Sequence, residues 1–469
     1  MQYTRYKLRG IDLAVDKRAV QLTMALSSFL TPFSGSSFNI ALPSIAREYG
    51  LSALAMSWAS LAYLLSSAML LIPFGKVADM YGRKRVYMYG IGVFTLASGL
   101  LAVYPSGSTI VALRALQGVG SAMIFGTGVA ILVSVHGPEE RGAVLGVNTA
   151  MVYVGLSVGP SLGGFLTSSL GWRSIFLVNV LVGLIIIATT LLKVRAEWAE
   201  GGNRSFDVRG STMYSLMLLA LMYGMSMLPD KGAYTYILGG LTILGAFIYH
   251  ERRVENPILD VNLFLGNKAF SFSNLAAFIN FSSTYAMTLL LSMYLQYIKA
   301  LDAQQAGLVM MASPITQAII SPLAGRLSDK MEPHKIASAG MAVTTLSLLP
   351  FIFLGEETTL AYVAGSLALL GVGLALFTSP NTNAIMGSVE RRFYGVASST
   401  VGTMRLTGQM LSTGVAMTLF AINLGGSQIV PELYPLLLSS VRTAFTIFFL
   451  LCIPGIAASM VRGRLNGEA

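Results

Sequence analysis

Long runs of apolar residues dominate this chain and restrict it to one fold class. Only 11% of its 469 residues are charged, against about 25% in soluble proteins. Fourteen runs are long enough to cross a bilayer, which takes about 20 mostly apolar residues; they begin near Ala19, Met56, Val86, Thr109, Gly142, Ser174, Gly210, Ala233, Ala269, Ala303, Ile336, Leu360, Gly395 and Thr443. We therefore predict an all-α polytopic membrane protein with fourteen transmembrane helices.

The distribution of basic residues predicts how these helices are oriented. With the N-terminus inside, cytoplasmic segments hold 24 of the 31 lysines and arginines, and the outside loops hold only Arg47, Arg173, Lys231 and Lys299. This asymmetry follows the positive-inside rule. It predicts a multi-pass protein of the cell membrane, plasma or inner, with both termini in the cytoplasm. The net charge of +10 is scattered over loops, so we expect no nucleic-acid partner.

The residue types used in metal and enzyme chemistry are sparse. The single cysteine, Cys452, excludes an intrachain disulfide. His136, His250 and His334 share no ligand spacing, so we expect no metal and no cofactor. The predicted spans contain no acid pair and no nucleophile beside a base, which argues against an enzyme.

An internal repeat divides the chain into two halves. "GKVADMYGRKR" from Gly75 is echoed by "GRLSDKMEPHK" from Gly325, and "GVGSA" from Gly118 recurs as "GVGLA" from Gly371. An even number of predicted helices separates the copies, so the repeat is parallel. We predict an N-terminal arm (1–18), a six-helix bundle (19–192), linkers with a two-helix insert (193–268), a second six-helix bundle (269–461) and a cytoplasmic tail (462–469).

Three motifs and their order resemble one transporter family. "GKVADMYGRKR" between the second and third predicted helices, "RALQGVGSA" in the fourth and "GLSVGPSLGG" in the fifth resemble the signature motifs of the major facilitator superfamily. The fourteen predicted helices, with "FDVRG" before the insert and "ENPILDVNLF" after it, are similar to its drug:proton antiporter branch. The resemblance covers residues 19–460 and implies a multidrug exporter that works by alternating access in antiport with protons.

Two of these motifs have both a structural and a functional interpretation. The resemblance implies that the first motif latches the two halves together in the outward-facing state; without that role it is an ordinary charged loop. The residues are Gly75, Asp79, Gly82, Arg83 and Arg85, with Asp329 in the second copy. In the fifth helix, Gly155, Gly159, Pro160, Gly163 and Gly164 make a smooth face for close helix packing, and the resemblance implies that this motif marks exporters.

Polar residues within the spans are the candidate substrate contacts. Arg114 and Gln117 share one helix face, and Arg405 shares another with Gln409. No predicted span contains an acidic residue, so we expect Arg114 to face a cavity and the two arginines to favour anionic or zwitterionic substrates. The other candidates, each with helix packing as its alternative role, are Asn39, Trp58, Tyr63, Asn148, Tyr153, Asn280, Tyr285, Gln317 and Asn381.

The chain departs from the family at one position of the first helix. Its relatives usually carry an acid a few residues before "NIALP", where this chain has Ser34, so proton coupling is left open. The sequence favours a secondary transporter, most simply a monomer, with a small-molecule substrate, lipid around it and protons as the coupling ion that the family implies. The alternatives are an anion or zwitterion uniporter or exchanger without proton coupling, and a non-transporting receptor or scaffold.

Overall fold

The computed structural model describes residues 3–8, 11–136, 140–194, 196–198, 206–255, 257–259, 261–390, 394–425 and 427–461. Six helices form the first half of the chain. They are α1 (Lys17–Tyr49), α2 (Ala53–Tyr81), α3 (Arg83–Val103), α4 (Gly107–Val135), α5 (Arg141–Leu170) and α6 (Arg173–Lys193). Two further helices follow, α7 (Val208–Met227) and α8 (Lys231–Glu251). We call these two helices the insert.

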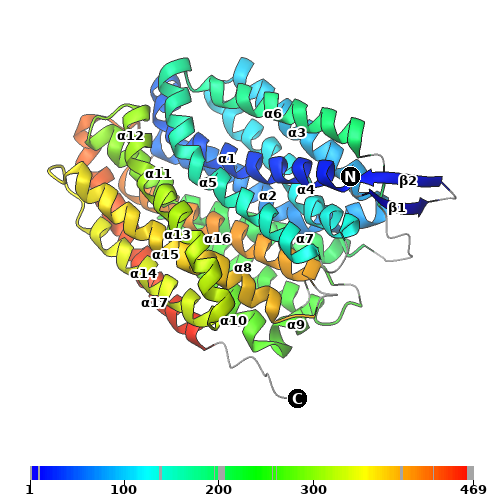
Figure 1. Cartoon of the computed structure of the whole chain (residues 1–469). Helices are drawn as coiled ribbons and strands as arrows, with labels where there is room; N and C mark the ends of the chain where they lie inside the picture. Colours follow the sequence, from blue (N-terminus) through cyan, green and yellow to red (C-terminus); the bar gives the residue numbers. More distant parts are fainter. Residues whose placement is uncertain are drawn as a thin grey trace.

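The second half begins with the short helix α9 (Val261–Gly266). Its long helices are α10 (Lys268–Thr284), α13 (Ala312–Lys330), α14 (Pro333–Ile352), α15 (Leu360–Gly387), α16 (Tyr394–Asn423) and α17 (Tyr434–Met460). Shorter pieces lie between them: α11 (Met287–Met293), the π-helical turn η1 (Tyr294–Ile298), α12 (Ala303–Met310) and the 3₁₀ turn η3 (Pro431–Leu433). The long helices lie side by side, with α1–α6 in blue to cyan above α13–α17 in yellow to red (Figure 1).

Among the described residues, 11 helical segments are long and apolar enough to cross a membrane. Each of the fourteen predicted runs begins within a helix. The long helices that fall outside the 11 segments are α1, α7 and α16. Two of them carry many polar side chains; α1, for example, buries Ser27, Ser28, Thr31, Ser34, Ser36, Ser37 and Asn39. The count of fourteen spans therefore stays a prediction.

The two halves use the same pairs of neighbouring helices. In the first half α5 packs on α1, α4 on α2 and α3, and α6 on α3 and α1. The corresponding contacts in the second half join α16 to α10, α15 to α13 and α14, and α17 to α14 and α10. Between the halves, α5 packs on α12 and α2 packs on α16. Helix α12, together with α13, is the counterpart of α2 in the second half, and α16 is the counterpart of α5. The two contacts are therefore equivalent, as expected for halves related by a two-fold axis.

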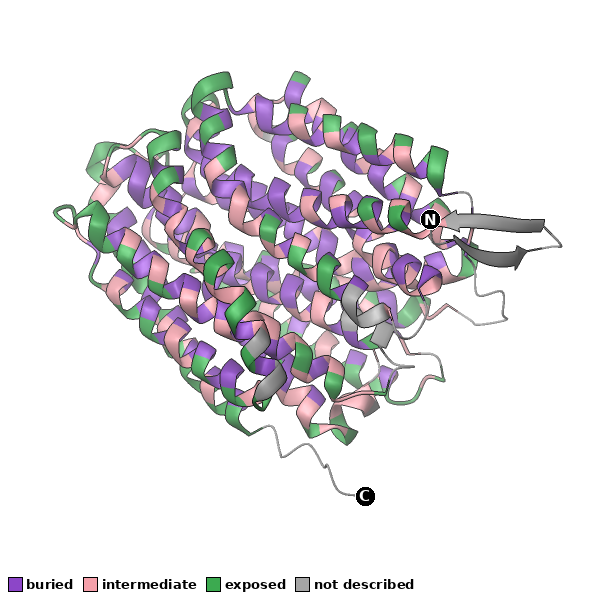
Figure 2. Cartoon of the chain, in the orientation of Figure 1, coloured by how far each residue is buried: buried purple, intermediate pink, exposed green. Residues whose placement is uncertain are grey.

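Apolar side chains cover much of the outer surface. Leu181, Leu191, Leu238 and Ile319 each expose at least 60% of their area, and exposed residues concentrate on the outward faces of the helices (Figure 2). A patch of this extent is unfavourable in water, but it matches a lipid environment. Within the insert, α8 buries few of its residues, so most of its surface would face lipid.

The N-terminal arm differs from the purely helical prediction. Strands β1 (Tyr3–Leu8) and β2 (Ile11–Asp16) form an antiparallel pair in which Tyr3 lies opposite Asp16 and Leu8 opposite Ile11. Only two residues separate the strands, a spacing typical of a β-hairpin. Apolar runs of membrane-spanning length, the signal from which the helices were predicted, do not indicate such a short pair of strands.

Candidate functional site

A cavity lies between the two halves. It has a volume of about 110 Å³. The first half contributes residues of α1 and α5, and the second half contributes residues of α10 to α13, α15 and α16. The lining residues are Ser36, Tyr153, Leu156, Ser157, Pro160, Phe281, Thr284, Tyr285, Met287, Thr288, Met310, Ser313, Pro314, Gln317, Leu367, Leu374, Thr378 and Gln409. Apolar walls with a few polar groups are typical of small-molecule sites.

A second, smaller cavity adjoins the first. It shares Leu156, Tyr285 and Gln409 with the larger one, and its own lining includes Tyr63 and Arg405. Because they share these lining residues, we treat the two cavities as one space between α13 and α2. Its walls are mostly apolar, with a few polar side chains such as Gln317 and Arg405. We call this combined space the central cavity.

Arg405 and Gln409 line the central cavity, and their side chains have no hydrogen-bond or ion-pair partner among the described residues. They lie four residues apart on one face of α16, with exposed fractions of 8% and 4%. The guanidinium of Arg405 lies 5.1 Å from the ring centroid of Phe125, a weak substitute for a carboxylate. A buried cation with no acceptor is costly, so this corner is suited to a group that supplies one.

Two helix breaks border the central cavity. The ninth predicted run is interrupted between α10 and α11 at Tyr285 and Ala286, and the tenth between α12 and α13 at Met311. The backbone N–H of Ala286 donates to Ser412 Oγ at 3.0 Å, which satisfies one group freed by the first break. Broken helices in membrane transporters are tolerated where they line a cavity. Hydropathy does not reveal these breaks because the apolar pattern continues across them.

Arg114 is placed differently from Arg405. It is 1% exposed and does not line either cavity. Its guanidinium lies between two aromatic rings, 4.2 Å from the centroid of Phe38 and 4.3 Å from that of Tyr63. It donates to Gln117 Oε1 at 2.5 Å and to the Ala59 carbonyl at 3.3 Å.

These contacts account for the buried charge of Arg114. Each cation–π contact contributes about 0.5–2 kcal/mol, comparable in sum to the roughly 2.5–3.5 kcal/mol cost of an arginine at mid-bilayer. The Gln117 amide in turn donates to Ser98 Oγ at 2.8 Å. Arg114 and Gln117 thus belong to a closed network, and Tyr63 connects that network to the central cavity.

Most of the other predicted contacts join neighbouring helices. Ser34 accepts from the Asn179 amide at 3.0 Å, Asn148 accepts from Ser28 at 2.7 Å, and Asn39 accepts from Ser60 at 2.5 Å. Asn280 approaches Met341, Asn381 donates to the Ser273 carbonyl, and Trp58 packs on Tyr223 of α7. None of these six residues lines the central cavity. The predicted residues that do are Tyr63, Tyr153, Tyr285, Gln317, Arg405 and Gln409.

The glycines of α5 bring three helices together. A side chain at Gly155 or Gly159 would overlap α1, and a Cβ at Gly163 would lie 2.7 Å from Ser37. Gly164 faces the other half, where a Cβ would overlap the Ala303 carbonyl of α12. From the opposite side, a Cβ at Gly307 would lie 2.8 Å from the Pro160 carbonyl. The motif therefore sets both the α1–α5 packing and the contact between the halves.

The halves are tied together at the end of the bundle where α1 finishes. Arg47 donates to the Gln296 carbonyl at 3.2 Å, and Gln296 donates to the Ile40 carbonyl at 2.9 Å. Gln428 donates to the Gly50 carbonyl at 3.0 Å beside a bridge between Ser52 and Gln428. At the opposite end, where α1 begins, no hydrogen bond between the halves is recorded in the described ranges.

Among the described residues, Asp79 and Arg83 of the loop motif after α2 contact residues of their own half. Asp79 accepts from Arg83 at 2.8 Å, and Arg83 also donates to Ser134 of α4 at 2.7 Å. Gly75 packs near Gly126 of α4. The side chain of Asp329, the second copy of the acid, lies outside the described residues.

A segment after α6 completes this loop, and the sequence analysis missed it. Glu197 accepts from the Lys84 N–H at 2.9 Å and lies 3.8 Å from the Arg85 guanidinium. Gly82 has φ +115°, and a Cβ there would lie 2.8 Å from the Glu197 carboxylate. The sequence feature that could have indicated this contact is Glu197 itself, an acidic residue close to the basic residues of the linker.

This geometry predicts a stability effect at Gly82. Gly82→Ala is expected to destabilise the protein by about 1–3 kcal/mol, because alanine is strained at positive φ and crowds Glu197. Thermal unfolding followed by tryptophan fluorescence should show a lower Tm. Gly92→Ala is the control, because nothing lies within 4 Å of its Cβ position. Equal Tm values for the two variants would contradict this account of the loop.

Comparison with known proteins agrees with the resemblance found in the motifs. The sequence profile of the Major Facilitator Superfamily matches residues 24–413, with a second match at 273–464. Riboflavin transporter RibZ of Clostridioides difficile (strain 630) is 29% identical over 88% of this chain and 90% of its own. Multidrug resistance protein Stp of Mycobacterium tuberculosis (strain CDC 1551 / Oshkosh) is 32% identical over 82% of this chain and 72% of its own.

A third relative has a name that also refers to resistance. Methylenomycin A resistance protein of Streptomyces coelicolor (strain ATCC BAA-471 / A3(2) / M145) is 27% identical over 80% of this chain and 79% of its own. The matches to the family and to these relatives extend across both halves and the insert. The chain therefore belongs to the major facilitator superfamily, and it is a multi-pass membrane transporter and not an enzyme.

Proposed function

We propose that this transporter exports small amphipathic or drug-like compounds that carry an anionic or zwitterionic group. The observation that supports this most directly is Arg405, a buried guanidinium that lines the central cavity with Gln409 and has no acceptor among the described residues. A carboxylate or similar group of a substrate would supply that acceptor. The aromatic and aliphatic walls around Tyr153, Phe281 and Leu374 would take the apolar remainder.

The proposed architecture has fourteen spans, two six-helix bundles and the insert, with both termini in the cytoplasm. In this orientation the end of α1 faces outward, so the contacts of Arg47, Gln296 and Gln428 close the outer side. The structure then corresponds to an inward-facing state. Asp79, paired with Arg83 of its own half, would exchange partners when the inner side closes, as the latch role requires.

Two coupling modes are considered. The family suggests antiport with protons. The chemistry of the cavity lining favours a uniporter or exchanger without proton coupling, because no carboxylate is among the described residues that line either cavity. Ser34, at the position of the usual family acid, is hydrogen-bonded to Asn179 and does not line the cavity.

Flux into proteoliposomes tests the function and separates these modes. The panel consists of anionic, zwitterionic and cationic aromatic compounds of matched size, with riboflavin added because one relative is named a riboflavin transporter. We expect saturable flux of the anionic and zwitterionic members. Uphill flux driven by a pH gradient alone would establish antiport, whereas flux of anions that follows voltage alone would favour the uncoupled mode. Saturable flux of cations only would contradict the proposed substrate class.

A further inference from the structure

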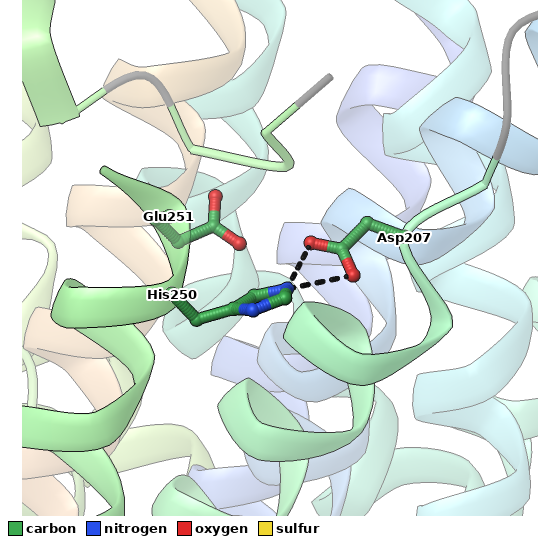
Figure 3. A group of neighbouring side chains, drawn as sticks. All are labelled: Asp207, His250 and Glu251. Atoms are coloured by element: carbon green, nitrogen blue, oxygen red, sulfur yellow. Dashed lines mark hydrogen bonds and ion pairs between the residues drawn. The ribbon is translucent and has the colours of Figure 1, made fainter. Parts of the chain in front are cut away.

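Three potential metal ligands meet where the insert begins and ends. Asp207 immediately precedes α7, and His250 and Glu251 are the last two residues of α8. The three side chains point toward one another (Figure 3). One ligand atom from each lies within 4.8 Å of the other two. The sequence spacing could not indicate this group, because 43 residues separate Asp207 from His250.

The hydrogen bonds of the cluster leave one buried oxygen unsatisfied. His250 Nε2 lies 3.0 Å from both carboxylate oxygens of Asp207. Glu251 is 1% exposed, and its Oε2 accepts from the Leu259 N–H at 2.8 Å. Its Oε1 has no hydrogen-bond partner in the part of the chain that the structure describes. Two carboxylate oxygens cannot bond each other without a proton, so this oxygen needs either a proton or a cation.

Gly210 keeps the space beside these oxygens open. Its backbone N–H donates to Asp207 Oδ1 at 2.9 Å. A Cβ at this position would overlap both Asp207 Oδ2 and Glu251 Oε1. Because glycine has no side chain, the two oxygens face a common gap that any other residue would fill.

The cluster offers a mixed set of ligand atoms. Asp207 and Glu251 contribute carboxyl oxygens and His250 contributes an imidazole nitrogen, and all three lie close enough together to reach one ion. A divalent cation bound between them would be the largest local charge and would supply a partner for Glu251 Oε1.

We propose that Asp207, His250 and Glu251 form a site for a divalent transition-metal ion, with Zn²⁺ as the best fit. Ligand atoms about 2.1 Å from a tetrahedral ion are about 3.4 Å apart, so small side-chain shifts from the present arrangement would suffice. One imidazole and two carboxylates with an open fourth position for water match Zn²⁺ or Mn²⁺ better than Ca²⁺, which takes six to eight oxygens. The bound ion would join the start of α7 to the end of α8, and through Glu251 to the linker at Leu259.

Metal titration of the whole protein tests this site. Tag-free protein in detergent, stripped with a chelator, would be titrated with Zn²⁺ against a chromophoric indicator. We expect one equivalent to bind at least tenfold more tightly than to His250→Ala. His334→Ala is the matched control, because His334 lies 3.2 Å from a single carboxylate, Glu332; it should bind Zn²⁺ like the parent. Gly210→Ala should weaken binding, because its Cβ would fill the gap.

A second measurement does not depend on the folding of a variant. Zn²⁺ should raise the Tm of the parent protein, and EDTA should reverse that increase. Equal Zn²⁺ affinity of the parent and His250→Ala, or an unchanged parent Tm, would overturn the proposal and leave the cluster as a hydrogen-bonded ion pair. Displacement of Zn²⁺ by equimolar Mg²⁺ would overturn the assignment to a transition metal.

Discussion

Arg405→Ala is expected to lower kcat/KM for anionic substrates by at least about 30-fold. Truncating one partner of a buried charge pair costs about 2–5 kcal/mol. Within the described part of the chain, no acceptor competes with the substrate for the Arg405 guanidinium. The measurement is initial flux in proteoliposomes over a range of substrate concentrations. The flux of a neutral aromatic compound of matched size, added to the panel for this purpose, should change far less, because only the charged contact is lost.

Two companion variants sharpen this prediction. Arg405→Lys keeps the charge but loses the planar fork, so it should recover part of the flux. Gln409→Leu, which keeps a side chain of similar size on the same face of α16, should have a smaller effect than Arg405→Ala. If Arg405→Ala lowered the flux of anionic and neutral compounds equally, the arginine would have a structural role and the proposed substrate class would lose its main support.

The second large effect is expected at the contact between the halves. Gly164→Leu should abolish transport, because a side chain at this position overlaps the Ala303 carbonyl of α12 and prevents α5 and α12 from closing the outer side. Gly146→Leu is the matched control in the same helix, because nothing lies within 4 Å of its Cβ position. Flux is measured for both variants at equal amounts of reconstituted protein.

Cross-linking reports the closure itself. Ser52 and Gln428 form a bridge between the halves, and residues paired in this way have the Cα separation of a disulfide. The only native cysteine, Cys452, is buried, so Ser52→Cys with Gln428→Cys gives a specific pair. We expect rapid cross-linking in the parent and the Gly146→Leu background and slow cross-linking with Gly164→Leu. Equal rates would show that Gly164 does not control closure of the outer side.

Local properties of the chain were enough to predict most of the fold. Each predicted apolar run begins within a helix, because a helix in lipid must satisfy its own backbone and exclude water along its whole length. The motif resemblance to the family was confirmed by the match to both halves. The breaks at Tyr285 and Met311 were missed because the apolar pattern continues across them, and only the tertiary structure shows that the Ala286 N–H is satisfied by the distant Ser412.

The candidate site was only partly accessible to the same reasoning. Arg114 and Arg405 look alike in sequence, since each is a cation in an apolar run four or fewer residues from a glutamine. In the structure Arg114 stacks between Phe38 and Tyr63, whereas Arg405 lines the central cavity. The surroundings of a side chain depend on how its helix is rotated about its own axis, and hydropathy does not predict that rotation.

The sequence by itself determined that this is a membrane protein, that it belongs to the family, and that an internal repeat relates its two halves. These follow from hydrophobicity, charge asymmetry and motif order, which are properties of residues close together in the chain. Only the tertiary structure decided which arginine lines the cavity and which glycine allows the two halves to pack closely. It alone also shows that Asp207 lies beside His250 and Glu251. Those facts depend on how helices rotate and pack against partners far away in the chain, and packing energy is shared among residues that no local pattern connects.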